Sequence, residues 1–381
     1  MSIGEPNDLT AAAAWALEEA GGAGASPATA WAPGRCTLVG EHVDYAGGQV
    51  LCIAVDRGIA AAVRPSPTAR YLAASAGSTV TRLDAGPAGD IGDRVLAPVV
   101  ALRNRGFSVP TIEVGIAATL PAGAGLASSA ALTVAVTTAI LRLLGATITA
   151  RELAAVTLYA EREVVGVPCG PLDQRAVIDA PDCGALLLDC RSGGETSLAW
   201  PWADVILVGC DTGVQHDVGG VEYRRRREET ESGLEALGVT SCQELRAAAI
   251  DSAPLDAAII RRLHHVMGET RRTVEAAEAL RRGDVDVLGG RMSASHRSLR
   301  DLHEVSTPAL DAVASAALDV PGCAGARMVG AGFGGAVVAV VTSAGAAACR
   351  TAMAAACGGG RTFELKPSPG LALLAPDVVQ G

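Results

Sequence analysis

The stretch TIEVGIAATLPAGAGLASSAALTVAVTTAILRLLG, residues 111–145, combines a strand, a glycine-rich turn and a helix. Apolar residues alternate with polar or small ones over 111–120, which is the period of a half-buried strand. A turn with Pro121, Gly123 and Gly125 follows, and the helical pattern runs from Ser128 to Gly145. Free N–H groups at a helix N-terminus bind anions, and glycines let phosphate oxygens approach the backbone. The stretch therefore predicts a phosphate-binding loop, or an ordinary capped helix after a glycine turn.

The residues after this turn limit how phosphates could be held. Ser128 and Ser129 stand where the helix begins, so either could cap it or offer its hydroxyl to Mg²⁺. The chain has a single lysine, Lys366, in the segment ELKPSPG. It therefore lacks both the P-loop lysine and the strand lysine of protein kinases. We expect phosphates to rest on backbone dipoles, hydroxyls and a metal ion.

Two other segments concentrate polarity and backbone freedom between apolar runs. PGRCTLVGEHVDYAGGQ, residues 33–49, lies between predicted strands at 35–39 and 50–55. GAGFGGA, residues 330–336, joins two apolar strands within 326–342. Glycines at such a density indicate either a close approach to the backbone or a tight hairpin.

Two carboxylates flank a turn in the middle of the chain. Glu161 lies on a predicted helix over 151–165, and Asp173 follows the Gly-Pro turn in PCGPLDQ. Mg²⁺ prefers one or two carboxylates together with phosphate oxygens. Glu161 is therefore a candidate metal ligand, and Asp173 is a candidate base for a substrate hydroxyl.

The remaining pattern mixes helices and strands without strict alternation. It predicts a loop over 21–33, strands at 184–190 and 205–210, and helices at 9–20, 220–237, 243–250, 254–282 and 284–303. This mixture favours an α+β fold over a doubly wound parallel sheet. We place a division near residue 200, giving lobes of residues 1–200 and 201–381.

Composition narrows the class of protein. The net charge of −10 argues against binding to nucleic acid or to an anionic membrane. The longest apolar run, near 123–145, is interrupted by hydroxyl side chains and an arginine, which indicates a buried helix and not a membrane span. No basic residue precedes Arg35, so no secretory signal is expected. Ten cysteines without a Cys-x-x-Cys pair fit a reducing cytoplasm.

Six segments together resemble a known family. GRCTLVGEHVDYAGG resembles the galactokinase signature, and PAGAGLASSAAL and VGAGFGGAVVAV resemble loop motifs of the wider GHMP (galacto-, homoserine, mevalonate and phosphomevalonate) kinase superfamily. AEREVVGVPCGPLDQ, VEYRRRREE and SHRSLRDLHEVSTPALD are similar to further galactokinase segments. These matches run in the family's order from about 31 to 342. The chain therefore resembles the galactokinase family.

The resemblance implies a two-lobed GHMP kinase fold with the active site in the cleft between the lobes. It implies MgATP as donor and the anomeric hydroxyl of galactose or a related sugar as acceptor, in a monomer or weak homo-oligomer. Asp173 would be the base and Arg35 its electrostatic partner. The implied acceptor contacts are Glu41, His42, Asp44, Gly170, Tyr223 and Gly332. The implied phosphate loop consists of Pro121, Gly123, Gly125, Leu126, Ser128 and Ser129, and the implied magnesium ligands are Ser129 and Glu161.

The chain departs from the galactokinase pattern at Thr37, Val43, Ala46, Pro171 and Arg175. Such changes would reshape a pocket wall or its support, and a site that binds hydroxyls is sensitive to that. An amino sugar, a uronic acid, a pentose or a cyclitol is therefore an alternative acceptor.

Two further functions are open on the sequence. A non-catalytic sugar and ATP sensor is one, because the phosphate loop has two serines where galactokinases have three. A kinase for homoserine or mevalonate is the other, and the acidic 41–44 segment argues against an anionic acceptor.

Overall fold

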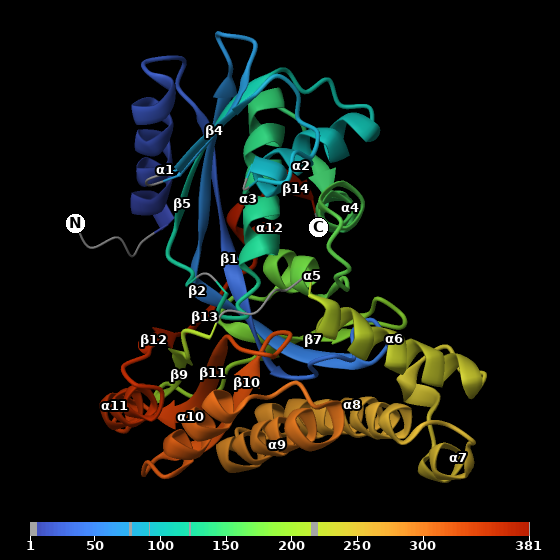
Figure 1. Cartoon of the computed structure of the whole chain (residues 1–381). Helices are drawn as coiled ribbons and strands as arrows, with labels where there is room; N and C mark the ends of the chain where they lie inside the picture. The colour runs from blue at the N-terminus through green and yellow to red at the C-terminus, as the bar shows by residue number, and fades with distance from the viewer. Residues whose placement is uncertain (1–5, 76–77, 91, 122, 215–219, 381) are drawn as a thin grey trace.

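The computed structural model describes residues 6–75, 78–90, 92–121, 123–214 and 220–380. These residues form two lobes, shown one above the other in Figure 1, each with a sheet covered by helices. Helices and strands are mixed in both lobes, so the predicted α+β class is confirmed. Among these residues, no helix is both long and apolar enough to cross a membrane.

The upper lobe contains an eight-stranded sheet. Its order is β4-β3-β5-β2-β7-β8, and β1 and β13 also pair with β2. β3 and β5 run parallel, whereas β2 is antiparallel to each of its partners. The strands are β1 (Ala28–Val39), β2 (Gln49–Pro65), β3 (Tyr71–Ser75), β4 (Ser78–Arg82), β5 (Ile112–Ala118), β7 (Gly184–Asp189), β8 (Glu195–Ala199) and β13 (Pro367–Ser368).

The two longest strands extend beyond the sequence-based prediction. β2 continues through the exposed Asp56 to Pro65, although only 50–55 were predicted. β1 starts at Ala28, so the predicted loop over 21–33 was wrong from that residue onward. Alanine is a poor strand former, and the pairing of Ala28 with Val63 decides the structure here. This long β1–β2 ribbon runs from the upper lobe down to the junction (Figure 1).

Helices cover both faces of the upper sheet. α1 lies on one face, and α2, α3 and α4 lie on the other (Figure 1). α3 begins at Ser128 as predicted, and Gly145 ends it with a φ of 60°. The predicted helix 151–165 divides into α4 and a π-helical turn, η1. The bounds are α1 (Pro6–Gly21), α2 (Gly92–Asn104), α3 (Ser128–Leu144), α4 (Ala150–Tyr159), η1 (Ala160–Val165) and α5 (Leu172–Asp179).

The lower lobe contains an antiparallel four-stranded sheet in the order β10-β11-β9-β12. Long helices, α8 and α9, pack beneath the junction, and α10 and α11 pack on the sheet (Figure 1). The strands are β9 (Val205–Asp211), β10 (Cys323–Val329), β11 (Ala336–Thr342) and β12 (Arg361–Leu365). The helices are α6 (Val221–Ala236), η2 (Cys242–Glu244), α7 (Ala247–Ser252), α8 (Ala257–Arg282), α9 (Val285–Ser298), η3 (Leu299–His303), α10 (Pro308–Leu318) and α11 (Ala346–Ala356).

The end of the chain returns to the upper lobe. β13 pairs with β2, α12 (Leu371–Leu374) packs on α5, and β14 (Val379–Gln380) pairs in parallel with β6 (Ile148–Thr149). β14 consequently lies among the helices of the upper lobe in Figure 1. The predicted division into lobes of residues 1–200 and 201–381 stays a prediction. Elements within residues 367–380 pack or pair with elements of residues 1–200.

Candidate active site

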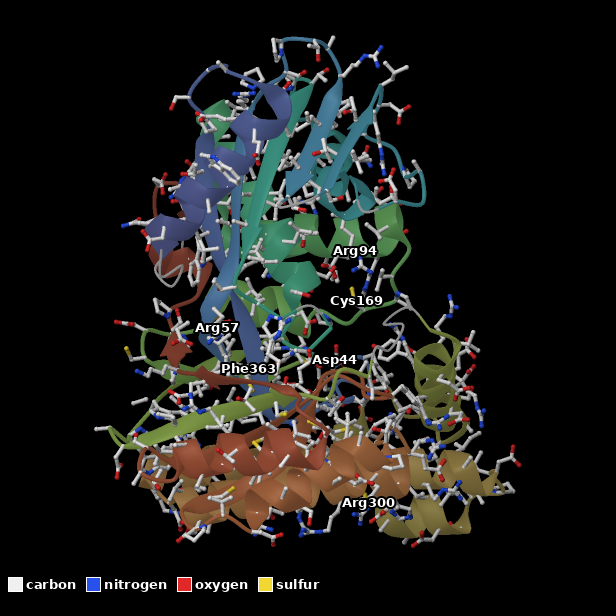
Figure 2. All side chains as sticks on the ribbon, turned by 60° about the vertical axis from the view of Figure 1, so that its left-hand side comes forward. Asp44, Arg57, Arg94, Cys169, Arg300 and Phe363 are labelled. Atoms are coloured by element: carbon white, nitrogen blue, oxygen red, sulfur yellow. The ribbon has the colours of Figure 1, made fainter. Side chains whose placement is uncertain are left out.

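A cavity of about 430 Å³ brings together segments that are distant in the sequence. Its walls are formed by the end of β1 and the residues after it, the turn before α3, the segment between η1 and α5, and the start of the 330–335 loop. Figure 2 shows Asp44, Arg94 and Cys169 around this region, between the two lobes. The predicted site residues that line it are Arg35, Glu41, His42, Asp44, Gly123, Gly125, Leu126, Ser128, Ser129, Glu161, Gly170, Asp173 and Tyr223.

Two predicted residues, Pro121 and Gly332, do not line this cavity. A side chain at Gly332 would collide with the carbonyl of Val305, so this glycine serves packing inside the lower lobe. Gly330 and Ala331 line the cavity in its place. The sequence pattern located the loop, and the assignment of Gly332 to the acceptor stays a prediction.

Arg35 and Asp173 form an ion pair in the wall of the cavity. Arg35 lies on β1, and Asp173 lies in the first turn of α5. The guanidinium Nε is 2.9 Å from Asp173 Oδ1, and Nη2 is 2.7 Å from the same oxygen. Arg35 is nearly buried, with 6% of its side chain exposed, whereas 30% of Asp173 is exposed. The carboxylate is thus held from one side and open to the cavity on the other.

Arg35 also connects this pair to the phosphate loop. Its Nη1 donates a hydrogen bond to the carbonyl of Gly125. Burial opposes the charged form, but Asp173 and Glu41 outweigh it and raise the pKa of the Arg35 guanidinium. A permanent positive charge therefore lies between the base candidate and the glycine turn.

Asp44 and Gly170 face each other on the acceptor side. A Cβ at Gly170 would overlap the Asp44 carboxylate, so any larger residue here would have to displace this aspartate. Burial, and then the nearby charge of Asp173, raises the pKa of Asp44 to about 6. Tyr223 on α6 closes this side of the cavity, and burial followed by Asp44 raises the pKa of its phenol.

Glu41 is tied to the 330–335 loop as well as lining the cavity. Its Oε1 accepts a hydrogen bond from the Gly330 N–H at 2.7 Å and lies 3.6 Å from Arg327 Nη2. Burial raises the pKa of Glu41, although Arg327 and Arg35 oppose the rise. This carboxylate therefore joins the two lobes across the site.

His42 makes a second connection to the same loop. Its backbone has a φ of 61°, a strained value for a non-glycine residue. Nε2 lies 3.0 Å from the Ala331 carbonyl and Nδ1 lies 3.1 Å from the Tyr45 hydroxyl. Burial, and then His265, lowers the pKa of His42 to about 3. The imidazole is neutral at physiological pH, and its Nε2–H donates to the carbonyl.

The turn before α3 presents a helix end without a side-chain cap. Ala127 occupies the N-cap position with a φ of 57°, and in the described part of the chain no side chain bonds to this end. The expectation that Ser128 or Ser129 caps the helix was therefore wrong. Ser128 and Ser129 both line the cavity, and the N–H groups of a first helical turn have no partner within the helix. Gly125 packs directly on the carbonyl of Val329, which holds the turn against the lower lobe.

Glu161 lies behind this turn, on the π-helical η1. Its carboxylate accepts hydrogen bonds from Gln174 at 3.1 Å and from the Cys169 thiol at 3.4 Å. Burial raises the pKa of Glu161, and the neighbouring Ser129 hydroxyl lowers it. A buried carboxylate beside a serine hydroxyl is a donor set that suits Mg²⁺. A π-helical turn is also a frequent feature of functional sites.

Sequence reasoning missed several residues of this site. Arg94 on α2 faces the cavity, but no motif in the sequence marked it. Arg327 is fully buried in β10, where it donates to the Thr37 carbonyl and approaches Glu41. An arginine inside the apolar run ARMVG was a usable signal, because a buried charge needs a partner. Tyr45 and Cys169 line the cavity within segments already recognised.

The residues that depart from the galactokinase pattern lie outside the cavity. Thr37, Val43 and Ala46 are buried, and none of them is among its lining residues. Val43 and Ala46 belong to an apolar core with α5, β7 and α8. Pro171 does not line the cavity either, and Arg175 pairs with Asp179 and Glu195 on the outside of α5. These five changes alter packing around the site and leave its lining intact.

Comparison with known proteins gives consistent matches along the chain. Family models match the GHMP kinase N-terminal domain over residues 94–179, the galactokinase galactose-binding signature over 18–65 and the GHMP kinase C-terminal domain over 276–359. The galactokinase of Thermotoga maritima is 34% identical over 314 residues, covering 81% of this chain and 88% of that protein. The human galactokinase is 36% identical over 358 residues, covering 88% of each chain.

Solved structures agree with these matches. The galactokinase of Lactococcus lactis complexed with galactose has a TM-score of 0.87 and 27% identity, covering 94% of this chain and 97% of that one. The mevalonate kinase of Methanococcus jannaschii shares the fold, with a TM-score of 0.69 and 16% identity. The predicted two-lobed GHMP kinase fold is confirmed. The chain belongs to the galactokinase family of the GHMP kinases.

Proposed function

We propose that this protein transfers the γ-phosphoryl group of ATP to the anomeric hydroxyl of galactose. Its family is one of phosphotransferases with an alcohol group as acceptor. The observation that carries the proposal is the Arg35–Asp173 pair, which lies between the uncapped helix end and the acidic acceptor side of one cavity. Galactose is favoured because the departures from the family pattern lie outside the cavity lining.

The donor side suits a nucleotide with its metal ion. The first-turn N–H groups of α3, together with the Ser128 hydroxyl, would hold phosphate oxygens. Ser129 and Glu161 would hold Mg²⁺, which neutralises charge on the phosphates when it is bound. Arg35 adds a fixed positive charge that stabilises the transferring phosphoryl group.

Asp173 would take the proton of the attacking hydroxyl. Both contacts from Arg35 fall on Oδ1, so Oδ2 is the oxygen available for that proton. In phosphoryl transfer, catalysis consists mainly of positioning and charge stabilisation. The pair supplies both, because Arg35 fixes the carboxylate in place while it balances its charge.

The acceptor side would recognise sugar hydroxyls through Asp44 and Tyr223, with Glu41 and His42 completing that wall. A carboxylate accepts hydrogen bonds from two hydroxyls and repels an anionic acceptor, which disfavours a uronic acid. We infer that Gly170 serves this wall by leaving room for Asp44. Pro121 and Gly332 would act indirectly, by shaping the two glycine loops.

The ten cysteines are all free thiols, which fits a reducing compartment, and we place the protein in the cytoplasm. For the oligomeric state, a monomer or a weak homo-oligomer remains our prediction.

A sugar panel with coupled ADP detection tests the proposal. Galactose should turn over, while an amino sugar, a uronate, a pentose and a cyclitol should be at least tenfold poorer in kcat/KM. 1-Deoxygalactose lacks the anomeric hydroxyl, so it should inhibit competitively and release no ADP. Turnover of 1-deoxygalactose would refute the assigned hydroxyl. Binding of galactose and ATP without any ADP would show a sensor instead of an enzyme.

A further inference from the structure

Two thiols meet in the lower lobe, away from the cavity. Cys210 lies on β9, and Cys357 directly follows the last residue of α11. Their sulfur atoms are 3.5 Å apart although 147 positions separate them in the sequence. Figure 1 shows β9 and α11 next to each other at the edge of the lower lobe. Cys210 is fully buried, and Cys357 is partly exposed to solvent.

The surroundings of Cys357 allow its sulfur to move. A disulfide requires the two sulfurs to approach to about 2.05 Å. Cys357 is followed by Gly358, Gly359 and Gly360, and the first two have φ values of 71° and 101°. Both of these glycines face open space, so the turn after α11 has few packing restraints. Gly360 packs on the two sulfurs, where any larger residue would separate them.

We propose that Cys210 and Cys357 are a modification site, at which hydroperoxides convert the two thiols into a reversible disulfide. Cys357 is the thiol that the peroxide reaches, because it is the exposed member of the pair. Cys210 is fully buried, which protects that thiol from direct oxidation by a peroxide in solution.

The reaction has two steps. Cys357 attacks the peroxide, the O–O bond breaks, and Cys357 becomes a sulfenic acid with release of water (of an alcohol, for an organic peroxide). The Cys210 sulfur then attacks Cys357 Sγ, the S–O bond breaks, and the departing hydroxide takes the Cys210 proton and leaves as water. In total two thiols lose two hydrogens, and one peroxide is reduced. A dithiol reverses the change by exchange through a mixed disulfide.

The cross-link would reinforce the edge of the active-site region. β9 ends at Asp211, directly after Cys210, and the hydroxyl of the next residue, Thr212, donates to the Gly335 carbonyl at 2.7 Å. Gly335 ends the glycine loop that Glu41 and His42 hold. A bond from Cys210 to Cys357 would attach this strand to α11. The loop it closes is long, so we expect the melting temperature to rise by about 5 °C.

The test uses the full-length reduced protein, treated with hydrogen peroxide in slight excess and then alkylated. Peptide mapping without reductant should give one linked pair containing residues 210 and 357, two hydrogens lighter than the free peptides. Dithiothreitol should restore both thiols and the original melting temperature. Cys357→Ser should abolish the linked pair, whereas Cys183→Ser, at an exposed cysteine elsewhere, should leave it unchanged.

Three outcomes would overturn the proposal. Cys357 could be found as a sulfinic acid with Cys210 still alkylatable in the unfolded chain. Cys210 could be found linked to another cysteine, such as Cys349. The linked pair could also persist in the Cys357→Ser variant. Because Cys357 is partly exposed, this variant is expected to fold, and Cys357→Ala provides a second replacement if it does not.

Discussion

Protonation of Asp44 should control sugar affinity below neutral pH. Asp44 faces the acceptor side of the cavity, where Asp173 and Glu41 add negative charge and Arg227 adds positive charge. Burial and Asp173 raise the pKa of Asp44 to about 6. If the ionised carboxylate accepts hydrogen bonds from the sugar, protonation removes this acceptor.

The size of the effect follows from that pKa. Asp44 is almost fully ionised at pH 7.5 and about one-tenth ionised at pH 5.0, so the Kd for galactose should rise about tenfold between them. Asp44→Asn should bind about 10- to 100-fold more weakly at pH 7.5, the loss of one charge-assisted hydrogen bond. Its Kd should be constant over the same pH range.

The same substitution should change stability in the opposite direction. The pKa of Asp44 in the folded chain lies above its ordinary value of 3.8, so its contribution to stability is full below pH 4 and is lost as the pH rises through 6. Ionised Asp44 thus costs up to about 3 kcal/mol at pH 7.5. Asp44→Asn should therefore melt at a higher temperature than the parent at pH 7.5, with no difference at pH 4.

Calorimetric titration with galactose, in the absence of ATP, is the appropriate assay. Turnover also requires Asp173 to accept a proton, whereas a binding measurement leaves that step out. A Kd that changes less than twofold between pH 7.5 and 5.0 would refute the reasoning. The same tenfold rise in Asp44→Asn would show that another group titrates.

Three further substitutions test separate parts of the site. Asp173→Asn should lower kcat by about 10²–10⁴-fold or more while the Kd for galactose stays within a fewfold, and near-full activity would remove Asp173 from the base role. Gly170→Ala should raise the KM for galactose more than it lowers kcat, because the new Cβ displaces Asp44; an unchanged KM would contradict this contact. Glu161→Gln should raise the Mg²⁺ concentration for half-maximal activity without affecting galactose binding in the absence of ATP. An unchanged magnesium requirement would count against Glu161 as a ligand.

Local pattern was sufficient for much of the active-site framework. The helix predicted from Ser128 to Gly145 is confirmed, because its apolar period and terminal glycine act within the segment itself. The ordered motifs were sufficient for the family, which the comparisons confirm. The start of β1 and the π-helical turn η1 were not predictable in this way, since neighbouring elements override weak local preference there.

The sequence alone did not decide what its differences from the galactokinase pattern do. Thr37, Val43 and Ala46 stand among candidate sugar contacts, so a change of substrate and a change of packing were both reasonable interpretations. Their side chains point into the protein and away from the cavity. Which way a side chain points depends on the surface that the segment packs against, and for Val43 and Ala46 that surface is supplied by α5, β7 and α8.

The sequence by itself determined the chemistry available to this protein: a glycine turn without a lysine, an arginine, and carboxylates in the order of the galactokinase motifs. The tertiary structure decided how these groups are used. It places Asp173 against Arg35 from 138 positions away and Glu41 against the Gly330 N–H from 289 positions away. Contacts at such separation leave no local pattern, because the first depends on how α5 packs on β1 and the second on how the two lobes meet, and not on the neighbours of each residue in the chain.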